Sequence, residues 1–170
     1  MTNTGQMLLV LGALVIFSLT LPSLNESLMY NETTIISTNA ELTAIALAQK
    51  ILTEASRLDF DEETISARLT SANDLTEDDD LGPDGSESFP NFDDVDDYHG
   101  VTIVDSTTFP SVPFTITGNV EYVSETNPST PSGTETFLKK LKITVTSPYM
   151  VNPASDDPVS ITLEQIFGYF

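Results

Sequence analysis

The feature that most constrains this chain is an apolar run near its start. Met7 to Leu21 reads MLLVLGALVIFSLTL, fifteen residues without a charge. A helix that crosses a hydrocarbon layer alone needs about 20 apolar residues, so this run is short for a free membrane span. A secretory signal would begin with basic residues, and the MTNTG before the run has none. The run therefore predicts a helix that is stored in a membrane until copies of itself bury it.

A second apolar pattern continues this helix. From Ile35 onward, small and aliphatic residues recur at the spacing of one helix face. The members of this stripe are Ala40, Ala44, Leu47, Ala48, Ile51, Leu52, Ala55 and Leu58. We expect one helix over residues 6–58, about 80 Å long at 1.5 Å per residue, with residues 7–21 as its membrane or filament-core part. Pro22 lacks an N–H, so we expect it to kink or loosen the helix.

Charge and cysteine content exclude several classes of function. The chain of 170 residues carries 26 acidic and 6 basic side chains, a formal net charge of −20. Phosphate binding needs clustered Lys and Arg, so nucleic acid is not expected as a partner. Because the chain has no cysteine, disulfides, thiol chemistry and thiolate metal sites are excluded.

Residues 59–100 form an acidic connection. The acidic start of Asp61 to Leu69 predicts a short helix or an extra turn. From Asp74 to Asp97 there are eleven carboxylates punctuated by Gly and Pro, which predicts a solvated loop. Calcium is the alternative reading, because hard cations bind clustered oxygen ligands. The segment from Asp80 to Gly85 matches only half of an EF-hand loop, since Gly82 stands at the third ligand position.

The one histidine, His99, follows this loop. It adjoins Asp96 and Asp97, and an acid-base role would need a partner nucleophile that the neighbouring sequence lacks. We therefore predict no enzyme activity and no cofactor, with His99 capping a turn or facing water. The nearby aspartates are expected to be solvated or to cap the backbone, and they are Asp93, Asp94, Asp96 and Asp97.

Residues 101–170 alternate between apolar and polar side chains, as in an antiparallel sheet with one covered face. Val101 to Val104 opens the first strand. The expected inward residues are Phe114, Ile116, Val120, Tyr122, Leu141, Ile143, Val145, Val159, Ile161 and Leu163. We expect a bulge or turn at Gly118-Asn119 and, because of Pro113, an edge position for that strand. The apolar end, residues 166–170, should dock at a sheet edge or in a subunit contact.

The chain has one basic patch, at Lys139, Lys140 and Lys142. It either docks an acidic loop of a neighbouring subunit or balances a polar sheet face. The helical stripe is the available cover for the inner face of the sheet. The predicted class is therefore α+β, a long N-terminal helix packed on a C-terminal antiparallel sheet.

Four features together resemble the type IV pilin and pseudopilin family. They are the Gly5-Gln6 step before the apolar run, Pro22 behind it, the amphipathic segment AELTAIALAQKILTEASRLDFD, and the nonapeptide FDDVDDYHG. The nonapeptide resembles a segment of minor pilins of the MSHA-pilus D type. Two features depart from the family pattern: MTNTG is not basic, and Val10 stands where the family usually has a glutamate.

The resemblance implies a life cycle for the chain. A prepilin peptidase would cut the leader-like segment 1–5 after Gly5, leaving Gln6 first. The helix would rest in the inner membrane, and pilus assembly machinery would then extract it into an extracellular filament of pilin subunits at the cell surface. Small residues permit close helix approach. The expected assembly residues are Met7, Leu8, Leu11, Gly12, Ala13, Phe17 and Pro22.

Two functions follow from these patterns. The first is a structural filament subunit that assembles through its apolar helix. The alternative is a membrane-anchored extracytoplasmic binding module, calcium-dependent or not, that never polymerises.

Overall fold

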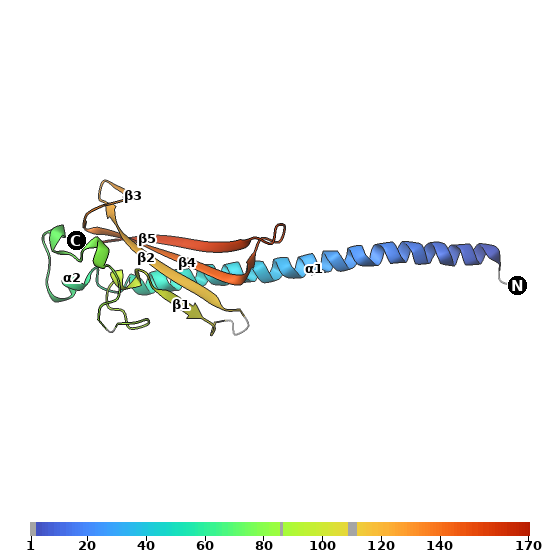
Figure 1. Ribbon diagram of the computed structural model, residues 1–170, viewed down its shortest axis with the longest axis horizontal. Helices are drawn as coiled ribbons and strands as arrows, with labels where there is room; N and C mark the ends of the chain where they lie inside the picture. Colours follow the sequence, from blue (N-terminus) through green and yellow to red (C-terminus); the bar gives the residue numbers. More distant parts are fainter. Residues whose placement is uncertain (1–2, 86, 109–111) are drawn as a thin grey trace.

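The computed structural model describes residues 3–85, 87–108 and 112–170 (Figure 1). The first two residues of the predicted leader-like segment lie outside this range. The chain is an α+β protein, as predicted, with a long N-terminal helix packed on an antiparallel sheet. Its helices are α1 (Thr4–Ala55) and α2 (Glu62–Ser66), with short 3-10 turns η1 (Ala72–Asp74), η2 (Asp78–Asp80) and η3 (Asp96–Tyr98). Its strands are β1 (Thr102–Asp105), β2 (Phe114–Ser124), β3 (Asn127–Pro131), β4 (Leu138–Val151) and β5 (Pro158–Gly168).

The helix α1 has two unlike halves. Every residue from Asn3 to Thr33 is exposed, and this part projects away from the rest of the chain (Figure 1). The covered half begins at Ser37, whose hydroxyl donates to the Val151 carbonyl at 2.7 Å. The buried residues of α1 are Ser37, Ala40, Ala44, Leu47, Ala48, Ile51, Leu52 and Ala55. The predicted stripe is confirmed within the helix, whereas Leu58 lies beyond the helix end and is half-buried.

Pro22 does not interrupt α1. The helix continues without a break from Thr4 to Ala55, so it does not stop and restart at Pro22, and the predicted kink or loosening stays a prediction. A proline removes one backbone hydrogen bond, here the one to the Ser18 carbonyl, and the bonds of the flanking turns hold the helix together.

The sheet has the strand order β1-β2-β4-β5, and β3 pairs with β2. All pairings are antiparallel. The strand β2 lies between β1 and β4, so the predicted edge position is wrong. Pro113 precedes the strand's first ladder pair, Asp105 with Phe114, and need not donate to the ladder.

The predicted bulge at Gly118-Asn119 is also wrong. Gly118 pairs with Ile143 and Asn119 with Lys142 in an unbroken ladder. A Cβ on Gly118 would collide with the backbone carbonyl of Tyr98. The glycine is therefore required for the close approach of the segment around η3 to β2.

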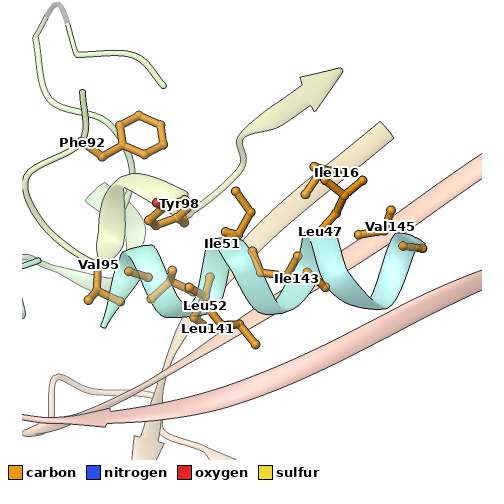
Figure 2. Close-up of a cluster of buried hydrophobic side chains, with 14 of the residues drawn as sticks. Leu47, Ile51, Leu52, Phe92, Val95, Tyr98, Ile116, Leu141, Ile143 and Val145 are labelled. Carbon is orange, nitrogen blue, oxygen red and sulfur yellow. The ribbon is translucent and has the colours of Figure 1, made fainter. Parts of the chain in front are cut away.

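The core lies between the back half of α1 and the inner face of the sheet (Figure 2). Leu47, Ile51 and Leu52 point from the helix toward the strands, and Phe92, Val95 and Tyr98 close one end. The facing strand residues are Ile116, Leu141, Ile143 and Val145, all nearly fully buried. Burial of one large aliphatic side chain contributes roughly 1.5 to 3 kcal/mol, so this layer holds helix and sheet together.

The side of β5 predicted to face the core does face it. Val159, Ile161 and Leu163 are half-buried and pack against the core, while the alternate residues of β5 are exposed. The C-terminal end docks through Tyr169, whose ring lies 5.7 Å from that of Phe60 and whose hydroxyl accepts from the backbone N–H of Leu69 at 3.0 Å. Phe170 is 95% exposed within the chain, so a subunit contact for this residue stays a prediction.

Candidate assembly surface on the N-terminal helix

The predicted cleavage step lies in the first turn of α1. The Asn3 side chain caps this turn by accepting from the Gly5 N–H at 3.4 Å, and the Asn3 carbonyl accepts from the Gln6 N–H at 2.8 Å. Gly5 and Gln6 are exposed. Cleavage between them stays a prediction.

The predicted assembly residues all lie in the exposed part of α1, distributed around the helix. The exposed fractions of the large side chains are 62% for Met7, 68% for Leu8, 54% for Leu11 and 60% for Phe17. Ala13 and Pro22 are exposed as well. A Cβ added to Gly12 would meet nothing within 4 Å. Within the described part of the chain, nothing crowds the Gly12 position, so packing of a neighbouring helix against it stays a prediction.

This surface suits an apolar environment. The first ionisable side chain of the chain is Glu26. The polar side chains of the run satisfy themselves: the Ser18 hydroxyl donates to the Val15 carbonyl at 2.9 Å, and the Thr20 hydroxyl donates to the Phe17 carbonyl at 3.2 Å. Neither hydroxyl would lose a partner if lipid or another helix covered it.

The hydropathy of α1 also shows that its front part suits an apolar environment. Among the described residues, α1 is the one helix long and apolar enough to cross a membrane, with a window of mean hydropathy 2.3 that has no buried residue. Eleven large apolar side chains lie exposed between Met7 and Leu21. Since full burial of each is worth roughly 1.5 to 3 kcal/mol, covering them would release on the order of 10 kcal/mol or more. The helix could therefore anchor in a membrane or pack against other helices.

A second cluster, which sequence reasoning missed, surrounds Lys139 in the core. Its ammonium Nζ lies 2.6 Å from an Asp61 carboxylate oxygen and 2.6 Å from an Asp96 carboxylate oxygen. It also donates to the Phe60 carbonyl at 3.1 Å. The rings of Phe60 and Tyr122 lie 4.9 Å and 5.2 Å from Nζ. Lys139 and Asp61 are completely buried, and Asp96 is nearly so.

These positions correct two predictions. Lys139 does not belong to an outer basic patch, because its side chain lies on the same inner face of β4 as those of Leu141 and Ile143. Three of the four aspartates of the nonapeptide, Asp94, Asp96 and Asp97, are buried instead of solvated. Two of them do cap the backbone: Asp94 accepts from the Asp97 N–H, and Asp97 accepts from the Asp93 N–H, both at 3.1 Å.

The buried carboxyl groups have different protonation states. Burial alone would raise the pKa of Asp61, but Lys139 and backbone hydrogen bonds lower it below its usual value. Burial, followed by the charge of Asp96, raises the pKa of Asp94 to about 9. Asp94 therefore keeps its proton at neutral pH and donates a hydrogen bond to Asp96. Burial raises the pKa of Asp96, which Lys139 opposes, and that of Asp97 to about 6.

The other two lysines balance the outer sheet face. Lys140 pairs with Glu121 at 2.6 Å, and Lys142 pairs with Glu164 at 3.4 Å. His99 is half-buried, and its Nδ1 lies 2.7 Å from the Val120 carbonyl oxygen. This contact joins the end of the acidic segment to β2.

Two carboxylate trios are close enough to hold a hard cation. They are Glu62, Asp93 and Asp94, and Glu87, Asp93 and Asp97, with ligand oxygens within 4.8 Å of one another. Neither includes a residue of the half-matched loop from Asp80 to Gly85. Acidic groups gather in this way without an ion as well, so calcium binding stays a prediction.

No protein-family model, no curated protein and no solved structure matches this chain. The family resemblance therefore depends on the motifs and on the fold. A long N-terminal apolar helix packed on an antiparallel sheet is compatible with a pilin-like fold.

Proposed function

We propose that this protein is a structural subunit of a type IV pilus-like filament that assembles through the front half of α1. The observation that carries the proposal is the bare apolar rod. The exposed part of α1 from Thr4 to Thr33 is about 45 Å long at 1.5 Å per residue, and the apolar run from Met7 to Leu21 makes up about 22 Å of it. Soluble proteins rarely expose an apolar surface of that extent unless another molecule covers it.

In this proposal lipid covers the rod first and other subunits cover it later. The rod would lie in the inner membrane until prepilin peptidase and the assembly machinery act on the chain. It would then pack against the rods of other subunits in an extracellular filament, with the sheets outside. Gly12 and Ala13 supply the small side chains that let two rods approach closely.

A plain membrane anchor would use the same rod differently. An anchor tolerates any apolar residue, whereas a helix bundle requires small residues where its helices touch. The carboxylate trios would then serve a binding module that stays at the membrane.

The variant Gly12→Leu separates these two functions. It is more apolar than the parent, so we expect it to remain in the membrane fraction of a host that assembles such filaments. We expect it to be absent from filaments sheared off the cells, because the added side chain keeps neighbouring rods apart. The matched control Leu9→Ile keeps the side-chain volume and should assemble normally. Normal filaments of Gly12→Leu would show that close packing at this position is wrong, and a parent chain never found outside the membrane would favour the anchor.

A further inference from the structure

The buried cluster at Lys139 brings an amine and two carboxyl groups into direct contact. The two contacts of Nζ, to Asp61 and to Asp96, are both 2.6 Å. The exposed fraction of the side chain is 0% for Lys139, 0% for Asp61 and 4% for Asp96. The rings of Phe60 and Tyr122 also flank Nζ, and the ammonium group is closed off from bulk solvent. Such surroundings disfavour separated charges and favour neutral products.

We propose that Lys139 and Asp96 become joined by an intramolecular isopeptide bond, an amide between Nζ of Lys139 and Cγ of Asp96. The inference is independent of the filament proposal, because it concerns the sheet end of the molecule.

The contacts of the two aspartates identify Asp96 as the acyl group. Asp61 accepts from the backbone N–H and hydroxyl of Thr76, the Glu63 N–H and the Tyr122 hydroxyl, in addition to Lys139. These donors hold Asp61 as a carboxylate, which is a poor electrophile, and its oxygen is the ionised group in direct contact with the Lys139 protons.

Asp96 is held differently. Lys139 donates to one of its carboxylate oxygens, and the protonated carboxyl group of Asp94 donates a hydrogen bond to it. A hydrogen-bond donor on this carboxyl withdraws electron density from Cγ and stabilises the charge that develops on oxygen during attack.

Formation of the amide needs no atom or electron from outside this cluster of side chains. The Lys139 ammonium passes one proton to the Asp61 carboxylate, and the freed Nζ lone pair attacks Cγ of Asp96. The carbonyl electron pair moves to an Asp96 oxygen, which gives a tetrahedral intermediate. One C–O bond of Asp96 then breaks, and its oxygen leaves as water with two protons that came from the ammonium. The amide keeps the third proton, and Asp61 and Asp94 return to their starting states.

The bond would fasten the acidic segment to the sheet. Lys139 lies at the start of β4, and Asp96 begins η3, the turn that crosses close to β2 at Gly118. The chain has no cysteine and therefore no disulfide to hold this crossing. An amide here would close a covalent loop in the domain, which restricts the unfolded chain as a disulfide does.

The test is the mass of the full chain, measured by mass spectrometry after denaturation. We expect the protein to be lighter by one water than its sequence requires, counted from the N-terminus found in the same spectrum. We also expect a branched peptide in which Lys139 is linked to Asp96 after proteolysis. The variant Asp96→Ala should regain the full mass, whereas the matched control Asp97→Asn, a buried neighbour without contact to Lys139, should keep the water loss.

Two results would overturn the proposal. One is a parent chain of full mass. The other is a water loss without the branched peptide, because dehydration at the Asp84-Gly85 step would give the same mass. Neither result depends on whether a variant folds, since both are read from the parent protein.

Discussion

The division of α1 into a covered half and a bare half can be tested with one substitution made at two places. Leu47→Ala removes three carbons from a side chain that is 7% exposed and lies between the helix and the sheet (Figure 2). At about 0.8 kcal/mol per buried carbon, the transfer term alone is about 2.4 kcal/mol. The cavity left behind adds to it, so we expect a loss of about 3 kcal/mol in the free energy of unfolding.

Leu19→Ala is the matched control on the same helix. Leu19 is 71% exposed, so we expect a change within about 0.5 kcal/mol. Urea unfolding of the full chain in a nonionic detergent, followed by near-ultraviolet circular dichroism, reports on the buried rings of Tyr98 and Tyr122. The 3 kcal/mol loss corresponds to a fall in Tm of about 6 to 12 °C for a chain of this size. Equal losses at the two positions, or a loss under about 1 kcal/mol for Leu47→Ala, would refute the division.

Two further predictions concern the sheet end. Because Asp94 and Asp97 have pKa values of about 9 and about 6 in the fold and near 3.8 when unfolded, the folded chain holds protons that the unfolded chain releases. Stability should therefore fall as pH rises, on the order of 5 kcal/mol between about pH 5 and about pH 8 in high salt, and Asp94→Asn should remove most of that dependence in urea titrations. An unchanged pH dependence in Asp94→Asn would show that Asp94 is not the group that titrates. Gly118→Ala places a methyl group against the Tyr98 carbonyl and should lower the free energy of unfolding by about 1 to 3 kcal/mol. Its control, Gly133→Ala, meets nothing within 4 Å and should leave stability unchanged. Equal urea unfolding midpoints for the two variants would refute the close approach of Tyr98 to β2.

Local patterns were sufficient to predict the long helix and the main strands of this fold, although not the short strand β3. The helical spacing of Ala40, Ala44 and Leu47 identified the covered face of α1, and the alternation of Leu141 and Ile143 identified the inner face of β4. Both depend on periods that a few neighbouring residues display. The exposed front of α1 was predictable from a local pattern as well, because its apolar run is continuous in the sequence.

The contacts between distant segments were not predictable in this way. Asp61, Asp96 and Lys139 meet only after the chain has folded, and each looks like an ordinary surface residue in its own stretch of sequence. The burial of Lys139 could have been predicted, because it lies two residues from Leu141 and therefore on the same inner face of β4. Gly118 was misread because the strand it lies in gives no sign of the Tyr98 carbonyl that passes over it.

The central claim is that other copies of the chain cover the front of α1. It is tested most directly by a photoreactive diazirine amino acid placed at Leu14, which is 59% exposed, and illuminated in intact cells that display the protein. We expect a covalent product of two chains, with the second chain captured within residues 7–21, whereas the same amino acid at Leu47 should react within its own chain. Capture of lipid alone from position 14, with no product of two chains, would contradict the claim.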